Sequence, residues 1–253
     1  MTKKTDKVKL ICIVPAAGIS SRYKNGNKLF DKNFGNNNLQ VITSSLISLS
    51  LDEIDKIIIG YNENDKLSRE YLDNFSQIAK EKISFNEDKI KFLKGGKSRQ
   101  ETVYNAMKFI GENIDDCSDL WVLVHDAARP CLKSNEIKLF INETIKSNVS
   151  SIMAYPIFDT IKKVDKNFKI SSTISRDEIW VAQTPQMFQY SILFESLEHC
   201  KNNNIEISDE SQALETLGYE CMVNMGYSHN IKITQNKDMD LGKYIIKSGD
   251  VND

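Results

Sequence analysis

Short apolar runs alternate with longer amphipathic segments along most of this chain. An apolar run bounded by turn residues is typical of a buried β-strand, and an apolar repeat of three to four residues is typical of a helix. Strands are expected at Leu10–Val14, Lys56–Gly60, Ile90–Leu93, Trp121–Val124, Glu220–Asn224 and Ile231–Thr234. Helices are expected near 41–50, 65–81, 189–202, 208–217 and 236–247, and one more from Ser98, which opens an S-x-x-E capping box.

This alternation predicts a doubly wound, mostly parallel α/β sheet of the Rossmann-like kind. Trp121–Val124 is apolar throughout, as in a central strand covered on both faces. A length of 253 residues suits a single domain spanning 1–253. Ligands of such sheets bind at the carboxyl ends of the strands, so the polar residues that follow the strands are the candidate site.

The pattern changes between about 157 and 179, where apolar and polar residues alternate around a turn at Asp165–Asn167. This alternation predicts a two-stranded β-arm. An isolated hairpin is marginal in water, so the arm is expected to pack against something. A symmetric second subunit would serve, and so would the arm's own domain.

Composition narrows the class of protein. The net charge of −2 gives no electrostatic footprint for nucleic acid. The five cysteines are widely spaced and the three histidines lie far apart, which favours reduced thiols in the cytoplasm over a zinc site or a disulfide framework. No stretch is long and apolar enough to span a membrane. Pro15 breaks the first apolar run, so the basic N-terminus is not expected to be a signal peptide.

The turn after the first strand is the most informative local feature. Ala16, Ala17 and Gly18 are small, so backbone N–H groups can approach phosphate oxygens, and Arg22 and Lys28 add positive charge. These features favour a nucleoside triphosphate, although an ordinary βα turn with solvated cations remains the alternative. The turn has neither the G-x-G-x-x-G fingerprint nor a Walker A lysine, which argues against a Rossmann-type oxidoreductase.

Asp126 follows the fourth expected strand, where one carboxylate can hold Mg²⁺ together with phosphate oxygens. A helix cap is the plain alternative for Asp126, and a surface charge is the alternative for Arg129. His125 is expected to be structural. Gly95–Gly96 allows close approach of a base or ribose, or forms a simple turn. Lys232 stands between two isoleucines and needs a partner, either a substrate phosphate or a carboxylate.

Six short motifs occur together and cover nearly the whole chain. They are Val14-Pro-Ala-Ala-Gly-x-x-x-Arg22, Leu123-Val-His-Asp-Ala-Ala-Arg-Pro130, Asp159-Thr160, Trp180-Val-Ala-Gln-Thr-Pro-Gln186, Ser208-Asp-Glu-Ser211 and Asn230-Ile-Lys-Ile-Thr234. In this order they resemble the 2-C-methyl-D-erythritol 4-phosphate cytidylyltransferase family of the non-mevalonate isoprenoid pathway. Ribitol-5-phosphate cytidylyltransferase is the close alternative, and the Pro-Ala-Ala-Gly turn, the Ala-Ala-Arg-Pro tetrad and Trp180 favour the erythritol enzyme.

The resemblance implies a role for each matching residue. CTP would be bound by Ala16, Ala17, Gly18, Gly96, Thr102 and Ala127. The catalytic residues would be Arg22, Lys28, Arg176 and Lys232, with Lys24 as the alternative to Lys28. The alcohol phosphate would also meet Arg129, Thr160 and Thr184, and Asp126 would hold Mg²⁺.

The resemblance further implies a homodimer in which the arm, with Thr160 and Arg176, reaches into the neighbour's site. The reaction would be in-line attack of the alcohol phosphate on the α-phosphorus of CTP, releasing pyrophosphate. No protein nucleophile is required, so catalysis would consist of positioning and charge stabilisation. A nucleotide-binding protein without catalysis is the alternative from another class. The occurrence of Arg22, Lys28, Asp126 and Lys232 together argues against it.

Overall fold

The structure, a computed structural model, describes residues 9–18, 23, 26–32, 34, 39–83 and 87–248. Its strands are β1 (Lys9–Pro15), β2 (Lys56–Tyr61), β3 (Ile90–Lys94), β4 (Leu120–Val124), β5 (Ser151–Pro156), β6 (Ile161–Val164), β7 (Ile170–Ile174), β8 (Trp180–Gln189) and β9 (Met222–Met225). Its α-helices are α1 (Val41–Ser48), α2 (Lys66–Asp73), α3 (Phe75–Lys82), α4 (Arg99–Asn113), α5 (Ser134–Ser147), α6 (Tyr190–Asn202), α7 (Glu210–Leu217) and α8 (Asn236–Lys247).

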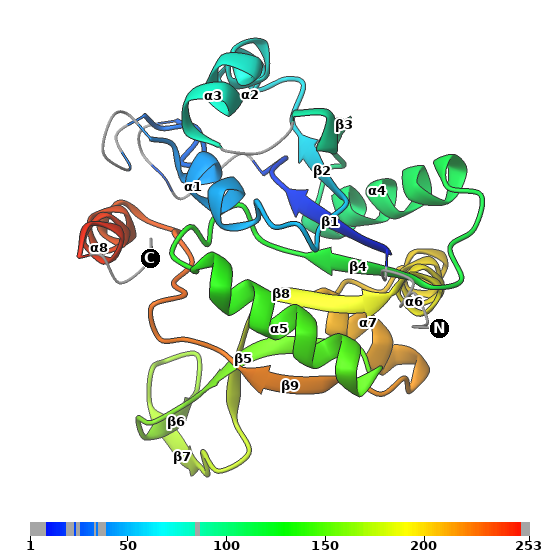
Figure 1. The fold of residues 1–253 in the computed structure, drawn as a ribbon. Coiled ribbons are helices and arrows are strands. Elements are labelled where there is room, and N and C mark those ends of the chain that lie inside the picture. The colour runs from blue at the N-terminus through cyan, green and yellow to red at the C-terminus, as the bar shows by residue number, and fades with distance from the viewer. Residues whose placement is uncertain are drawn as a thin grey trace.

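The central sheet has seven strands in the order β3-β2-β1-β4-β8-β5-β9 (Figure 1). Only β8 runs antiparallel to its neighbours β4 and β5, and the other pairings are parallel. The order β3-β2-β1-β4 matches one half of a Rossmann sheet, and the predicted mostly parallel α/β sheet is therefore confirmed.

Alternate residues of the central strands face two separate cores. Leu10, Cys12 and Val14 of β1 pack with helices α1, α3 and α5, whereas Ile11 and Ile13 pack with α4, α6 and α7. Figure 1 shows α1 and α5 in front of the sheet and α4 behind it. The side chains of β4 are buried along its whole length, as expected of a strand with helices on both faces.

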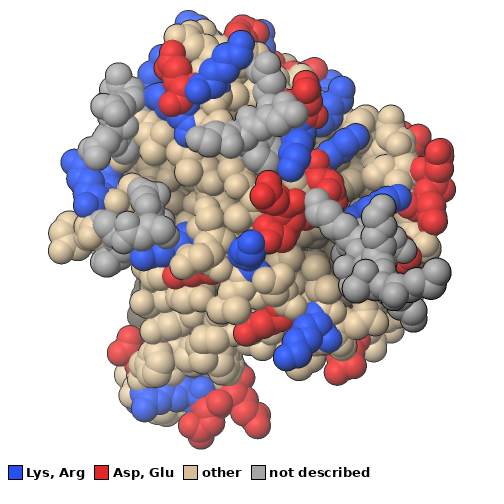
Figure 2. All heavy atoms as spheres, in the orientation of Figure 1, with Lys and Arg blue, Asp and Glu red and all other residues tan. Residues whose placement is uncertain are grey.

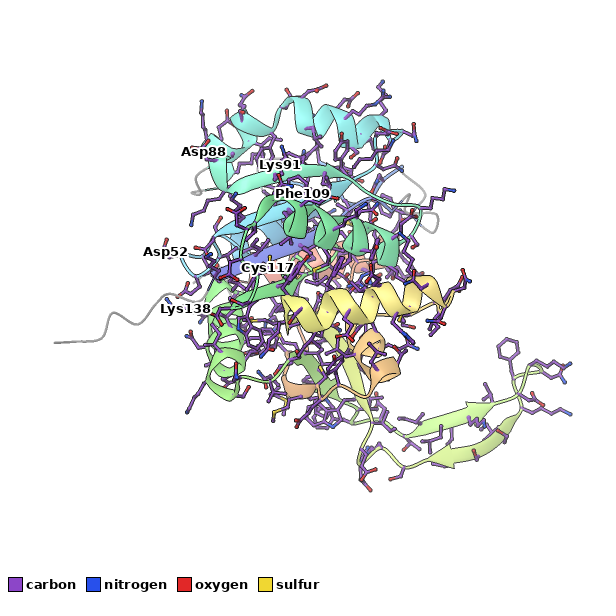
Figure 3. All side chains as sticks on the ribbon, turned by 90° about the vertical axis from the view of Figure 1, so that its right-hand side faces the viewer. Asp52, Asp88, Lys91, Phe109, Cys117 and Lys138 are labelled. Atoms are coloured by element: carbon purple, nitrogen blue, oxygen red, sulfur yellow. The ribbon has the colours of Figure 1, made fainter. Side chains whose placement is uncertain are left out.

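The predicted β-arm is present. Strands β6 and β7 form their own two-stranded antiparallel sheet, and Figure 3 shows it extending away from the body of the molecule. Asp165 closes the turn by accepting hydrogen bonds from the backbone N–H groups of Asn167 and Lys169. At the arm's root, Ile157 N–H donates to the carbonyl of Ile179. The arm then continues directly into β8 of the central sheet.

Two of the sequence predictions are wrong in detail. The expected strand at Ile231–Thr234 is absent, because Ile233 makes one backbone hydrogen bond to Ala128 instead of a ladder. The expected helix at 65–81 is two helices, since the side chain of Asn74 caps the carbonyl of Glu70 and ends α2. The sequence analysis did not predict α5, β5 or β8. Within the described residues, no helix combines the length and apolar character needed to cross a lipid bilayer.

Candidate active site

The small residues after β1 lie against the turn that follows β3. Ala16 N–H donates to the carbonyl of Gly60 at 2.7 Å, which keeps the chain beside β2 after β1 ends. A side chain at Gly95 would meet the Cβ of Ala17 at 2.4 Å, so only glycine fits there. The two turns predicted to bind the nucleotide are thus brought into contact.

A cavity of 690 Å³ opens beside these two turns, within the size range of small-molecule sites. It is lined by Ala17, Gly18, Asn62, Glu63, Asn64, Lys94, Gly95, Gly96, Lys97, Glu101 and Asn105. The predicted base-binding residue Gly96 therefore faces open space. Thr102 does not line this cavity, and it is buried. Its hydroxyl accepts from Gly96 N–H at 3.0 Å and donates to the carbonyl of Ser98, so it shapes the turn.

Asp126 lies just past the end of β4 and is surrounded by cations. Its Oδ1 accepts from Nε of Arg99 at 2.8 Å, and its Oδ2 lies 2.7 Å from Nζ of Lys232. The guanidinium of Arg129 is farther away, with Nε at 3.9 Å from Oδ2. The predicted residues Asp126, Arg129 and Lys232 are thus brought together. The carboxylate partner left open for Lys232 is Asp126 itself.

The cations determine the charge of Asp126. Burial alone would raise the pKa of this carboxyl, but the charges and hydrogen bonds of Arg99 and Lys232 outweigh it and hold the pKa well below its usual range. Asp126 is therefore ionised at neutral pH. Of its two closest cations, Lys232 is the more exposed, so its side chain has room to turn toward a polyanionic ligand.

Sequence reasoning missed Arg99 and Glu210. Arg99 is the first residue of α4, and its Nη1 donates to Oε1 of Glu210 at 2.7 Å. Burial raises the pKa of Glu210, and Arg99 opposes the rise. Both residues stand in segments that the sequence analysis quoted, the capping box that starts at Ser98 and the motif Ser208–Ser211. The sequence does show an arginine and a glutamate, each at the start of an expected helix. No rule of sequence spacing predicts that two residues so far apart form an ion pair.

His125 is structural, as expected. Its Nε2 lies 3.1 Å from the carbonyl of Arg129, so this nitrogen carries the proton and donates it. Its Nδ1 then accepts from the hydroxyl of Thr184, at 3.2 Å. The same hydroxyl accepts from Asp126 N–H at 3.0 Å. Burial lowers the pKa of His125 to about 4, so the ring is neutral.

Other predicted substrate residues are also engaged within the fold. Thr184 is buried, and its hydroxyl is used by His125 and Asp126. The Nη1 of Arg129 donates to the carbonyl of Asn230 at 2.7 Å, which ties it to the loop that carries Lys232. Ala127 is buried, and its carbonyl accepts from the hydroxyl of Ser45.

Of the two cations predicted in the first loop, the structure describes Lys28 but not Arg22. Arg22, like the alternative Lys24, lies outside the described residues. Lys28 is half-buried, and its charge helps to lower the pKa of Asp238, which caps the start of α8. The preceding Asn27 donates to the carbonyl of Gly18 at 3.2 Å, so the Lys28 segment adjoins the turn after β1.

Thr160 and Arg176 are not part of this cluster. Both are exposed, Thr160 just before β6 and Arg176 two residues after β7, and the hairpin that these strands form extends away from the body (Figure 3). The predicted role of Thr160 and Arg176 at a neighbouring subunit's site stays a prediction.

The resemblance implies a magnesium ion, and the residues present fit one only together with substrate. Among the described residues, no group of three or more His, Cys, Asp or Glu side chains could hold a metal ion. Magnesium is often held by one or two carboxylates plus substrate phosphates, and Asp126 can supply the one carboxylate. Its Oδ2 is paired with Nζ of Lys232 at 2.7 Å.

Comparison with known proteins agrees with the fold. Residues 10–248 match the family model described as 2-C-methyl-D-erythritol 4-phosphate cytidylyltransferase. A relative of that name from Wigglesworthia glossinidia brevipalpis is 39% identical over 241 residues, covering 94% of this chain and 96% of the relative. One from Acinetobacter baumannii is 34% identical over 247 residues, covering 97% of each chain.

The solved structures include the Francisella tularensis enzyme of the same name. It is 31% identical with a TM-score of 0.73, and the match covers 94% of this chain and 99% of that one. The family match covers the sheet, the arm and the loop that carries Lys232. The chain belongs to the 2-C-methyl-D-erythritol 4-phosphate cytidylyltransferase family.

Proposed function

We propose that this protein transfers the cytidylyl group of CTP to 2-C-methyl-D-erythritol 4-phosphate, giving the 4-CDP alcohol and pyrophosphate. The observation that carries the proposal is the Asp126 cluster at the carboxyl edge of the sheet, beside a cavity bounded by two close-approach turns. Names of the relatives support the erythritol phosphate over ribitol 5-phosphate as the acceptor.

The reaction needs positioning and charge stabilisation more than covalent chemistry. An oxygen of the alcohol phosphate attacks the α-phosphorus in line, and pyrophosphate leaves. Backbone N–H groups of Ala16, Ala17 and Gly18 are suited to bind the phosphates of CTP. Arg22 and Lys28 are proposed to stabilise the charge that develops on the α-phosphate.

Lys232 is proposed to exchange one anion for another. In the absence of ligand it pairs with Asp126, and 42% of its side chain is exposed, so it can turn toward a substrate phosphate. Asp126 would then hold Mg²⁺, which supplies charge neutralisation at the phosphates when bound. Arg129 and Thr184 would act through the loop and backbone that they hold in place.

The protein is also proposed to act as a homodimer through the arm. The arm and the neighbouring edge of the sheet expose an unusual number of apolar side chains: Phe158, Val164, Phe168, Ile170, Ile174, Ile179, Trp180, Val181, Met222, Val223 and Met225. Figure 2 shows the lower projection of the molecule as largely uncharged, with charged groups at its lower end. Exposed apolar patches of this extent mark interaction surfaces.

In this dimer, Thr160 and Arg176 would bind the alcohol phosphate at the partner's site. The five free thiols support a reducing compartment such as the cytoplasm. Sedimentation velocity measures the oligomeric state directly. A monomer at the protein concentration of the assay would contradict the dimer.

Pyrophosphate release tests the proposed activity. Purified protein is incubated with CTP, Mg²⁺ and either 2-C-methyl-D-erythritol 4-phosphate or ribitol 5-phosphate. Release with the first acceptor at a kcat/KM well above that with the second supports the proposal. A preference for ribitol 5-phosphate would assign the related activity instead, and no release with either would leave a nucleotide-binding protein. Omission of Mg²⁺ with added chelator tests the metal.

A further inference from the structure

Arg99 joins two buried carboxylates that come from distant parts of the chain. Its Nε donates to Oδ1 of Asp126 at 2.8 Å, and its Nη1 donates to Oε1 of Glu210 at 2.7 Å. The side chain of Glu210 is 0% exposed, and that of Asp126 is 8% exposed. One guanidinium therefore fixes the position of the Asp126 carboxylate relative to the start of α7.

Arginine is suited to this bridge and lysine is not. The guanidinium is a rigid planar fork, so two of its nitrogens can point at two different acceptors with a fixed angle between them. A lysine ammonium is a single point charge on a flexible stem. It can neutralise one carboxylate but does not hold two in a fixed relation.

Stability alone is a weak reason for this pair. Replacing a buried ion pair with apolar side chains of similar volume is often neutral or stabilising. Within the described part of the chain, Oε2 of Glu210 has no hydrogen-bond partner, so the burial of this carboxylate is only half compensated. A buried carboxylate that is only partly hydrogen-bonded costs stability, so we infer that the Arg99–Glu210 pair serves to fix the position of another group.

The other contacts of Asp126 show what is being specified. Its backbone N–H is held by the hydroxyl of Thr184, and its Oδ1 is held by Arg99. Its Oδ2 lies 2.7 Å from Nζ of Lys232, whose side chain is 42% exposed, and 3.9 Å from Nε of the largely buried Arg129. Because the backbone N–H and Oδ1 are held by close hydrogen bonds, Oδ2 is the oxygen whose nearest partner can turn toward a ligand.

We propose that Arg99 is a positioning residue, held in place by Glu210, which fixes the carboxylate of Asp126 so that Oδ2 faces the ligand site. The role in turnover rests on the proposed function. Arg99 itself does not touch substrate in this proposal. It acts by removing the rotational freedom of Asp126, and misplacement of a catalytic group by about 1 Å can lower a rate by about 10²-fold.

Two variants separate positioning from stability. Arg99→Met alone would leave Glu210 charged and buried without a counterion, so it is combined with Glu210→Leu, which removes the pair together. In the double variant Asp126 retains Lys232 and Arg129, and the fold is expected to persist with a Tm near that of the wild type. Arg99→Lys keeps the positive charge and removes the fork.

The matched control is Lys108→Met with Glu112→Leu. This pair lies on the same helix, α4, with Nζ 3.7 Å from Oε1 and both side chains 60% exposed. It is expected to leave Tm, kcat and both KM values near those of the wild type. Any loss in the test variants that the control does not share is then due to the position of the pair.

The expected result is a folded double variant with kcat lowered by about 10²-fold and a much smaller change in the KM for CTP. Arg99→Lys should also fold, and its kcat should be as low as that of the double variant. If the double variant retains the wild-type kcat at the wild-type Tm, the positioning role is overturned and the pair is structural. The same follows if Arg99→Lys has the kcat of the wild type.

A crystal structure of the double variant gives a readout that does not depend on turnover. A changed or multiple orientation of the Asp126 side chain supports the inference, and an unchanged single orientation overturns it. If the wild type itself releases no pyrophosphate, the proposed function fails, while this structural comparison still decides whether Arg99 fixes Asp126.

Discussion

Lys232 places its Nζ 2.7 Å from Oδ2 of Asp126, so the amine that is proposed to bind substrate phosphate occupies the carboxylate oxygen that is proposed to bind metal. Each of these two groups is the other's counterion until a ligand supplies both a phosphate and a cation. The pairing compensates the charge of a buried carboxylate.

Lys232→Met should therefore affect turnover more than folding. We expect kcat/KM for the alcohol phosphate to fall by about 10²-fold, because a preorganised cation is lost. The side chain is 42% exposed and Asp126 retains Arg99, so the free energy of unfolding should change by about 1 kcal/mol or less. Lys237→Met, on the exposed side of α8, is the control. Wild-type kinetics in Lys232→Met would remove Lys232 from the mechanism.

Thr184→Val should lower stability through Asp126. Valine is nearly isosteric with threonine but leaves the buried Asp126 N–H and the His125 Nδ1 without their partner. We expect the free energy of unfolding to fall by about 1–3 kcal/mol in urea denaturation. Thr184→Ser, which keeps the hydroxyl, should retain most of it. A raised KM for the alcohol phosphate at unchanged stability would instead place this hydroxyl on the substrate.

His125 should make the protein less stable as the pH falls below neutrality. Burial lowers the pKa of its ring from 6.5 to about 4, with opposing and supporting contributions from Asp126, Arg129 and Arg99. The unfolded chain therefore binds a proton that the folded chain excludes. This contribution to stability is fully present above pH 6.5 and is lost as the pH falls toward 4, by about 3 kcal/mol in total.

The measurement is the free energy of unfolding between pH 7.5 and about 4. The wild type is compared with His125→Gln, which cannot titrate in this range. The difference between the two proteins isolates the histidine from the carboxyl groups that titrate at lower pH. Parallel stability curves for the two proteins would show that the buried ring does not exclude the proton.

Lys28→Ala should reduce turnover while CTP still binds. A cation that acts on charge developed in the transition state contributes to kcat, so we expect a loss of about 10²-fold in kcat. Calorimetric titration with CTP should show binding near that of the wild type. Lys32→Ala, at an exposed position of the same segment, is the control. Near-normal kcat in Lys28→Ala would move the role to Lys24.

Mixed dimers test whether Arg176 serves the neighbouring site. Lys28→Ala and Arg176→Ala chains are each expected to be nearly inactive alone. In a dimer that contains one of each, one site collects both lesions and the other collects neither. Random exchange should therefore restore about a quarter of wild-type activity. Verified heterodimers without restored activity would show that the arm does not reach the partner's site.

The sequence predicted the elements whose signal is local. Trp121–Val124 is apolar in an unbroken run, and the alternation around Asp165 gives a hairpin whatever the rest of the chain does. Ile231–Thr234 has the same local pattern as a strand, but Lys232 pairs with Asp126 and Ile233 bonds to Ala128, and among the described residues no strand pairs with this segment. Strand pairing is a tertiary property, and a short apolar run does not encode it.

The site shows the same division. The rule that strand ends meet at one edge of a sheet predicts Asp126 at the site, whereas the family resemblance implies the roles of Arg129 and Lys232 beside it. Glu210 was missed because its importance arises only from burial against Arg99, more than a hundred residues earlier in the chain. The substrate role of Thr184 is implied by the family resemblance, and the sequence alone does not show that its hydroxyl contacts His125 and Asp126.

Strand β8 has a consequence for how the two ends of the molecule are related. It begins at Trp180, directly after the arm, and four residues later Thr184 holds the backbone of Asp126. Trp180, Val181 and Ala182 pair with β5, and Gln186 to Gln189 pair with β4, so the strand connects the arm to the centre of the sheet. A compound bound at the root of the arm that shifted β8 would therefore shift Thr184 and with it the carboxylate of Asp126. Because such a compound would not occupy the nucleotide site, its inhibition would be non-competitive with CTP.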